Sequence, residues 1–224
     1  MFNHSSSNLF TSADTAFRLG TNTLLLKGFI APYQSTLITA LTQVTQQAPF
    51  RHMVTRGGFK MSVAMSNCGG YGWISDRKGY RYSAVDPINE KPWPNMPASF
   101  LELASNAATA AGFHNFIPDA CLINRYEIGA KMALHQDQDE QDFTQPIVSV
   151  SLGIPATFLL GGLNRANKTE RVLLEHGDVL VWGGVDRLRF HGVLPIKRPK
   201  NGLYENQDMA FNNHRINLTF RRAY

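Results

Sequence analysis

The spacing of apolar residues changes along the chain, and the first third favours helices. Leu37, Ile38, Leu41 and Val44 recur at helical spacing within 33–47, directly after Pro32. A second apolar stripe runs through 97–112 and stops at Gly112, a residue typical of helix ends. Together with a short strand expected at 23–30, this pattern predicts two helices that pack against a sheet.

From about residue 118 onward, short apolar segments separated by glycine-containing turns replace the helical spacing. Many short strands of this kind are typical of a β-sandwich or jelly roll. The pattern therefore predicts a mixed α+β fold, mainly β, in which two helices cover one sheet. We expect strands at 120–126, 147–152, 157–160, 171–174, 178–182, 188–191 and 215–220.

Residues 51–93 differ from both regions. Seven basic residues stand here against three acidic ones, and six aromatic residues and six glycines are interleaved with them. One interpretation is a surface loop with ordinary exposed charge. The other is a glycine-rich flap that binds a polyanion through its charges and stacks bases on its aromatic rings.

Composition narrows the class of protein. The chain has 224 residues, enough for one domain with a full core, and 43% of them are hydrophobic. No apolar run approaches the roughly 20 residues needed to cross a bilayer, so we expect no membrane span, and residues 1–13 resemble a flexible polar tail. Cys68 and Cys121 are expected to be free buried thiols, which suits a cytoplasmic protein. The net charge of +5 is compatible with a nucleic-acid partner.

Three residues suggest a metal site. His135 and Asp137 are two apart, so in an extended segment their side chains point the same way. His191, on a strand expected much later in the chain, could face His135 across a sandwich. Each residue alone has an ordinary structural explanation. Together they form a set of two histidines and one carboxylate, which suits Fe(II) oxygenases, although zinc hydrolases use the same ligands.

The last expected strand, Arg215–Phe220 with Arg221, has two unlike faces. Ile216, Leu218 and Phe220 alternate with polar residues, and two of those polar residues are arginines. The polar face is either a solvated sheet surface or the wall of a pocket that clamps a dicarboxylate by bidentate pairing. Beside a metal, 2-oxoglutarate would fit such a pocket.

These motifs carry a family resemblance from about residue 23 onward. The chain resembles the AlkB family of nucleic-acid dealkylases, and within it the bacterial members. Met132 departs from the leucine expected at its position. The matching segments are MSVAMSNCGGYGW (61–73), KPWPNMP (91–97), DACLINRY (119–126), LHQDQDE (134–140), PIVSVSLG (146–153), LLEHGDVLVWGG (173–184) and RINLTFR (215–221).

The resemblance implies an architecture and a set of site residues. It implies a single dioxygenase domain at 14–224, with a double-stranded β-helix (jelly-roll) core at 118–224 and a nucleotide-recognition flap at 51–93. The iron ligands would be His135, Asp137 and His191. The 2-oxoglutarate pocket would comprise Asn124, Arg125, Tyr126, Trp182, Arg215, Asn217 and Arg221. The substrate contacts would be Trp73, Tyr80, Arg81, Tyr82, Asp139 and Arg165.

The resemblance also implies an activity. It is Fe(II)- and 2-oxoglutarate-dependent oxidative demethylation of N1-methyladenine and N3-methylcytosine, which releases formaldehyde, succinate and CO2. The expected partner is methylated single- or double-stranded DNA, with RNA as an alternative, and we expect a monomer. Three rival functions remain open: the same chemistry on free nucleotides or protein side chains, a metal-free nucleic-acid-binding module, and a zinc hydrolase.

Overall fold

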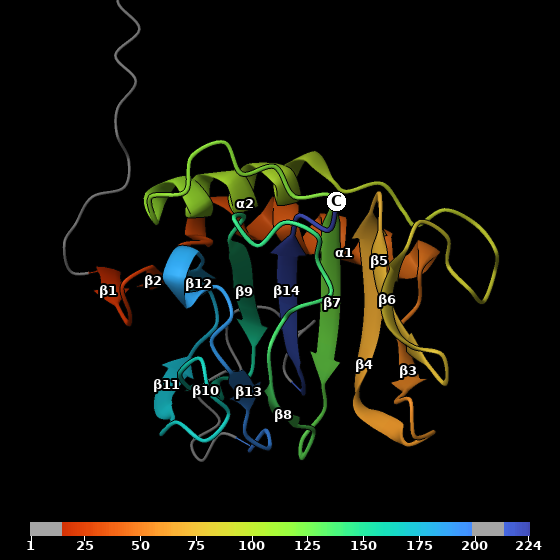
Figure 1. Cartoon of the computed structure of the whole chain (residues 1–224). Coiled ribbons are helices and arrows are strands. Elements are labelled where there is room, and N and C mark those ends of the chain that lie inside the picture. Colours follow the sequence, from red (N-terminus) through yellow and green to blue (C-terminus); the bar gives the residue numbers. More distant parts are fainter. Residues whose placement is uncertain (1–14, 199–212) are drawn as a thin grey trace, which may run out of the picture.

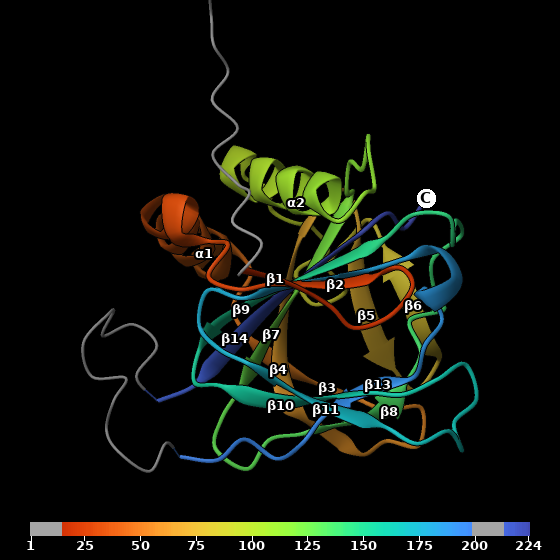
Figure 2. The ribbon, with the colours of Figure 1, turned by 90° about the vertical axis from the view of Figure 1, so that its left-hand side faces the viewer.

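The computed structural model describes residues 15–198 and 213–224, and it places two sheets face to face with two helices outside them. The tail expected at 1–13 lies outside the described residues. The large sheet has the strand order β1-β2-β12-β9-β14-β7-β4-β3, and all its paired strands are antiparallel. The small sheet has the order β11-β10-β13-β8. Figure 2 shows the helices, the large sheet and the small sheet as successive layers.

The large sheet combines strands from both halves of the chain. Its middle is formed by β9 (Ile147–Gly153), β14 (Arg215–Arg221) and β7 (Ala120–Tyr126), whose residues are almost all buried. The flanking strands are β1 (Ala16–Arg18), β2 (Thr23–Leu26), β12 (Val179–Trp182), β4 (Lys60–Gly69) and β3 (Arg51–Val54).

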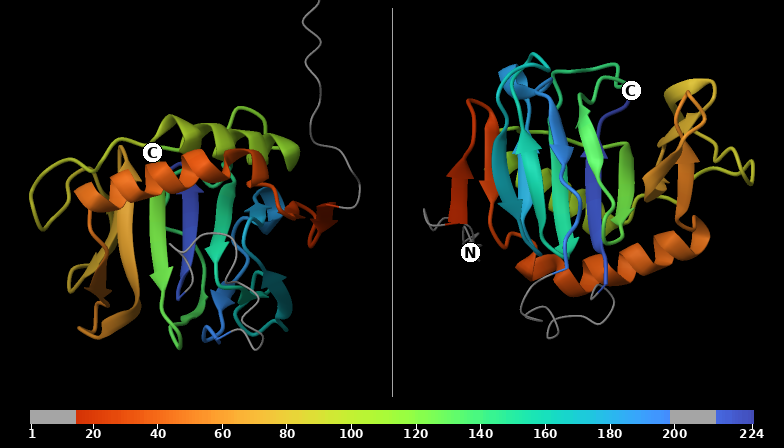
Figure 3. Two further views of the ribbon diagram at one scale, coloured as in Figure 1. Left: turned by 180° about the vertical axis from the view of Figure 1, so that it is seen from behind. Right: turned by 90° about the horizontal axis from the view of Figure 1, so that it is seen from below.

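The two expected helices are confirmed as α1 (Gln34–Gln47) and α2 (Ala98–Ala110). Both lie along the outer face of the large sheet, as Figures 1 and 3 show. Their apolar stripes and the outward side chains of the sheet form one core cluster. It includes Leu37 of α1, Phe100 of α2 and Leu218 of the sheet. A short 3-10 turn, η2 (Ala31–Tyr33), leads into α1 at Pro32.

The small sheet covers the inner face of the large one. It contains β8 (Met132–His135), β10 (Ala156–Leu160), β11 (Glu170–Leu174) and β13 (His191–Val193). The strand expected at 188–191 was misplaced, because β13 begins only at His191. The preceding turn, η3 (Gly184–Asp186), continues into a loop through Phe190 that makes no strand pairing.

Residues 51–93 are more regular than the sequence indicated. β3 and β4 extend the large sheet, while β5 (Gly72–Asp76) and β6 (Gly79–Ser83) form a separate hairpin beside them. β4 could not be recognised from the sequence, because Val63 to Cys68 are all buried and no alternation of apolar and polar residues marks the strand. The region 51–93 therefore contributes two strands to the large sheet and also forms a separate hairpin.

The described residues contain no helix long and apolar enough to cross a membrane. Cys68 and Cys121 are free and buried, as expected. Although they are distant in sequence, they are register partners on β4 and β7.

Candidate metal centre and cosubstrate cavity

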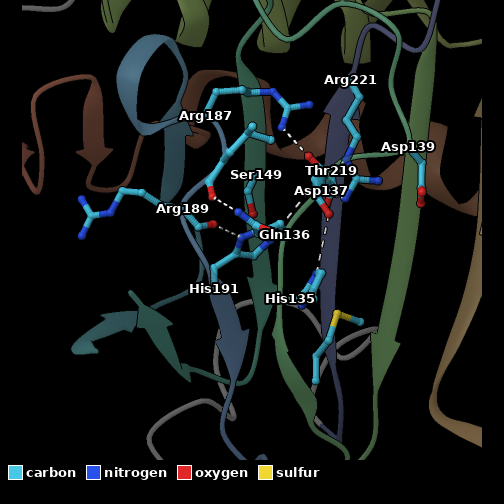
Figure 4. Close-up of polar contacts among 12 residues, drawn as sticks. His135, Gln136, Asp137, Asp139, Ser149, Arg187, Arg189, His191, Thr219 and Arg221 are labelled. Atoms are coloured by element: carbon cyan, nitrogen blue, oxygen red, sulfur yellow. Dashed lines mark hydrogen bonds and ion pairs between the residues drawn. The ribbon is translucent and has the colours of Figure 1, made fainter. Parts of the chain in front are cut away.

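His135, Asp137 and His191 meet between the two sheets (Figure 4). His135 ends β8 and His191 begins β13, and the two are register partners in the small sheet. They are therefore neighbours on adjacent strands of one sheet. The expectation that they face each other across the sandwich is wrong. His135 Nε2 lies 3.6 Å from Asp137 Oδ1, and His191 Nε2 lies 3.7 Å from Asp137 Oδ2. One ligand atom from each residue falls within 4.8 Å of the others.

Both imidazoles are oriented by main-chain carbonyls. His135 Nδ1 lies 2.9 Å from the carbonyl oxygen of Ala133, and His191 Nδ1 lies 3.0 Å from that of Arg189. A carbonyl can only accept, so each Nδ1 carries the proton and each Nε2 is left with its lone pair. Burial lowers the pKa of His191 to about 4, with a further contribution from His135 against the opposing effect of Asp137. His191 is therefore neutral at pH 7, as a metal ligand must be.

Asp137 stays ionised although it is buried. Burial disfavours its charge, but Arg221 and the two histidines outweigh burial and hold the pKa of Asp137 below its usual value. Arg221 donates to Asp137 Oδ2 from Nη2 at 2.6 Å and from Nε at 3.1 Å. The carboxylate is thus charged and fixed before any metal is present.

This donor set fits a divalent metal. Two imidazole nitrogens and one carboxylate oxygen converge, which leaves other coordination positions open, as in Fe(II) oxygenases. Within 15–198 and 213–224, no other trio of histidine, cysteine or acidic side chains meets in this way. The ligands by themselves do not distinguish iron from zinc.

A cavity of about 560 Å³ surrounds the three side chains. Its wall includes the inward face of β14, because Arg215, Asn217, Thr219 and Arg221 point between the sheets. The alternative of a solvated sheet face is therefore wrong: these four residues are at most 9% exposed. Ile216, Leu218 and Phe220 pack on the helix side, as the alternation predicted.

Arg215 gives the clearest sign of an anionic ligand. Its Nη2 donates to Ser151 Oγ at 2.8 Å, while Nε and Nη1 are buried and have no partner among the described residues. Burial lowers the pKa of Arg215 to about 10, so the guanidinium remains charged at neutral pH. An unpaired buried cation is costly, and a carboxylate in the cavity would remove that cost. The cavity therefore fits a dicarboxylate that chelates the metal at one end and meets Arg215 at the other.

The other expected cosubstrate residues divide into two groups. Asn124, Tyr126 and Trp182 line the cavity, and the indole nitrogen of Trp182 and the amide oxygen of Asn124 are buried without a partner in the described part of the chain. Asn217 also lines it, but its side chain is fully engaged. It donates to Ser149 Oγ and the carbonyl of Val150, and it accepts from Asn124 and Thr219. Asn217 thus orients its neighbours.

Arg125 does not line the cavity. On β7 it alternates with Asn124 and Tyr126, so it points to the opposite face of the large sheet. There its guanidinium lies 4.8 Å from the centre of the Phe50 ring and pairs with Glu127 at 3.1 Å.

The expected substrate residues also divide. Trp73, Tyr80, Asp139 and Arg165 line the cavity. Trp73 Nε1 donates to Asp139 Oδ2 at 2.7 Å, and its ring stacks on Tyr80 with centroids 5.5 Å apart. Arg81 instead pairs with Asp76 on the hairpin, and Tyr82 is buried. Neither of these two lines the cavity.

Sequence reasoning missed several buried polar partners. Glu140 accepts from the hydroxyl of Tyr82 at 2.6 Å and from Arg187 Nη2 at 2.9 Å, with Arg221 Nε also 3.3 Å away. No spacing rule connects Glu140 to Arg187. Ser149 and Ser151 could have been noticed, because they are polar residues two apart in an otherwise apolar strand.

Comparisons with known proteins agree with this geometry. A family model described as "2OG-Fe(II) oxygenase superfamily" matches residues 22–221. The chain is 53% identical over 205 residues, 92% of each chain, to "Alpha-ketoglutarate-dependent dioxygenase AlkB" of Escherichia coli strain K12. It is 33% identical to "DNA N(6)-methyladenine demethylase ALKBH1C" of Arabidopsis thaliana, over 69% of this chain and 38% of that protein. A solved structure titled "The structure of OsALKBH1" superposes with a TM-score of 0.77 at 32% identity, over 92% of this chain and 99% of the other.

Proposed function

This chain belongs to the AlkB family within the 2OG-Fe(II) oxygenase superfamily, and we propose that it repairs alkylated DNA by oxidative demethylation. Its membership makes it an Fe(II)- and 2-oxoglutarate-dependent dioxygenase and removes the zinc hydrolase and the metal-free module as alternatives. The proposed substrates are N1-methyladenine and N3-methylcytosine, and the products are formaldehyde, succinate and CO2.

One observation carries the proposal. The cavity that contains the metal-binding side chains also has an aromatic and acidic rim formed by Trp73, Tyr80 and Asp139. The reacting centre and a surface that suits a flipped, positively charged base therefore share one space. An enzyme that acts on a base must take it out of the helical stack, and aromatic stacking of about 1–3 kcal/mol per base offsets part of that cost.

The residues of the cavity have separable roles in this proposal. His135, Asp137 and His191 hold the iron, and Arg215, with Asn124 and Tyr126, holds 2-oxoglutarate. With both bound, these cofactors supply oxidation of an N-methyl group to a hydroxymethyl group, which leaves as formaldehyde. Asp139 accepts a hydrogen bond from the exocyclic amine and offsets the positive charge of the methylated ring.

The charge distribution supports a nucleic-acid substrate over a protein side chain. The tip of the β3–β4 hairpin carries Arg56 and Lys60, both exposed, and Thr55 of the same turn lines the cavity. Phosphate groups on either side of a flipped base would meet these charges. We propose that DNA is the physiological polymer, with RNA as the alternative, and that the protein acts as a cytoplasmic monomer.

The experiment combines metal binding and turnover. Under anaerobic conditions, Fe(II) and 2-oxoglutarate should together produce a visible absorption band, and a single-stranded oligonucleotide with N1-methyladenine should release formaldehyde once O2 is admitted. Asp137→Ala should abolish both signals, because the remaining histidines cannot hold the metal in the same geometry.

Asp142→Asn is the matched control, since Asp142 lies on the same loop and its carboxylate bonds to Thr144 and Gln145 nearby and to none of the three metal ligands. This variant should keep both signals. Formaldehyde release by Asp137→Ala near the level of the unchanged protein would contradict the assignment of the metal ligands. A normal absorption band without formaldehyde release from any methylated oligonucleotide would contradict the proposed substrate.

A further inference from the structure

Two separate segments carry the metal ligands, and strand pairing joins them at only one point near the site. The first is the ligand loop, which we define as residues 135–145, and the second is the return segment, residues 187–191. His135 pairs with His191 in the small sheet, but β8 ends there. Asp137 lies two residues beyond the last strand position, where the main chain has no sheet partner to fix it.

Arg187 supplies the missing connection. Its side chain is only 3% exposed, and it reaches from the return segment across the ligand loop (Figure 4). Nη1 donates to the carbonyl oxygen of Asp137 at 2.8 Å, Nη2 donates to Glu140 at 2.9 Å, and Nε donates to the carbonyl oxygen of Gln145 at 3.1 Å. One planar group therefore holds the loop at its beginning, middle and end.

Gln136 makes a connection in the opposite direction. Its Nε2 donates to the carbonyl oxygen of Leu188 at 2.6 Å, so the ligand loop also holds the return segment. The hydrogen bonds of both side chains involve protein atoms alone. The relative position of Asp137 and His191 is thus fixed by bonds that exist before the metal binds.

We propose that Arg187, assisted by Gln136, is a positioning residue of the metal centre: it fixes the main chain of Asp137, whose carboxylate Arg221 holds, relative to the two histidines. Groups that orient metal ligands typically contribute 10- to 100-fold to metal affinity. Arg187 touches neither substrate nor cosubstrate in this assignment, so its effect is exerted through the main chain of Asp137 and through Glu140.

An electrostatic role and a positioning role of Arg187 predict opposite changes in metal affinity when the residue is removed. Arg187 is a positive charge close to Asp137. If charge alone mattered, removing it would strengthen the binding of a divalent cation. If it positions the loop, removing it weakens binding although the local charge becomes more favourable.

Arg222 provides a control with a similar set of bonds. It donates to two carbonyl oxygens, those of Tyr224 at 2.6 Å and Ile117 at 3.2 Å, and pairs with Asp119. These partners all lie outside the ligand loop and the return segment. Arg222→Gln therefore removes an arginine with a similar set of bonds without loosening Asp137.

The test is titration of the metal-free full chain with Co(II), with the affinity and the visible Co(II) spectrum as readouts. Arg187→Gln should bind Co(II) about 10- to 100-fold more weakly than the unchanged protein, with a shifted spectrum. Arg187→Lys should also bind more weakly although it keeps the charge, because one ammonium cannot reach three separated acceptors. Arg222→Gln should retain the affinity and spectrum of the unchanged protein.

Gln136→Met keeps the proposal testable if Arg187→Gln does not fold, since it removes one hydrogen bond and buries no charge. It should weaken Co(II) binding severalfold. Unchanged or tighter binding by folded Arg187→Gln, or by Gln136→Met if Arg187→Gln is unfolded, would overturn the positioning role. An equal loss in Arg222→Gln would also overturn it. The inference rests on the metal centre, and the two can be told apart. Lack of Co(II) binding by the unchanged protein would overturn the metal centre and the inference with it, whereas unchanged binding by folded Arg187→Gln would overturn the positioning role alone.

Discussion

At the scale of single residues, the arginines that the sequence associated with 2-oxoglutarate have three different environments. Arg215 lines the cavity, and its buried Nε and Nη1 have no partner among the described residues. Arg221 is already bonded to Asp137. Arg125 lies on the far face of β7, beside Phe50. The same residue type therefore serves as a candidate anion binder, as a partner of a metal ligand, and as a packing residue.

This difference predicts the effect of Arg215→Lys. Lysine keeps the charge but not the planar pair of donors, so the affinity for 2-oxoglutarate should fall by about 10- to 100-fold, equivalent to roughly 1.5–3 kcal/mol for a charged hydrogen bond. Calorimetric titration of the Co(II)-loaded protein with 2-oxoglutarate measures it. Arg125→Lys is the control and should bind 2-oxoglutarate normally. Equal affinities in all three proteins would remove Arg215 from the cosubstrate site.

At the scale of elements, the β5–β6 hairpin is attached to the rest of the molecule by buried contacts. Tyr82 of β6 donates to Glu140 of the ligand loop. The main-chain N–H of Trp73 donates to the side-chain oxygen of Asn67 on β4, and the Asn67 side-chain nitrogen donates to the carbonyl oxygen of Trp73. Trp73 also packs partly against two core clusters. The hairpin is thus more firmly held than a glycine-rich surface loop, and Trp73 has a structural role beside its place at the cavity rim.

Trp73→Ala should therefore affect both binding and stability. We expect the affinity for a methylated single-stranded oligonucleotide to fall by about 1–3 kcal/mol from lost stacking, together with a lower thermal midpoint because Trp73 is half-buried. Fluorescence anisotropy with a labelled oligonucleotide and thermal unfolding measure the two effects.

The control is Trp93→Phe, which changes the flap's other tryptophan. Trp93 is 4% exposed, bonds to the carbonyl oxygen of Ser83 and does not line the cavity. It should lower stability and leave the affinity of the folded protein unchanged. Normal oligonucleotide affinity in Trp73→Ala would place base stacking elsewhere, with Tyr80 as the next candidate.

At the scale of the whole molecule, positive charge is distributed unevenly. α1 contains no charged residue and α2 contains only Glu102, so the helix side is nearly uncharged. Arg51 and Arg81 are neutralised by Asp86 and Asp76 within the flap. In the described part of the chain, no ion pair neutralises five exposed flap residues: Arg56, Lys60, Arg77, Lys78 and Lys91. A nucleic acid should therefore approach the cavity side.

The salt dependence of oligonucleotide binding tests this layout. Removing Arg56 and Lys60 together, as Arg56→Ala with Lys60→Ala, should reduce the slope of log K against log salt by about 1.4, roughly 0.7 for each single-strand phosphate contact. Gln43→Lys adds an exposed charge on α1 and should leave the slope unchanged. A larger effect from Gln43→Lys than from the double variant would place the nucleic acid on the helix side.

Local sequence patterns alone predicted the helices, the faces of the last strand and part of the metal site. Helical spacing located α1 and α2 to within a residue or two, and two-residue alternation assigned the faces of β14 correctly. The short spacing of His135 and Asp137 indicated the metal ligands on the ligand loop. These features depend on neighbours a few residues apart, so the sequence states them directly.

Which residues from distant segments meet at the metal site could be seen only in the tertiary structure. The pairing of β8 with β13 places His135 beside His191, 56 positions apart, and the same pairing places Arg187 over the carbonyl of Asp137. β4 was not recognisable in the sequence, because both faces of its second half are buried and no alternation marks the strand. Sheet register is set by packing over the whole molecule, so no local pattern could show which buried polar groups would meet.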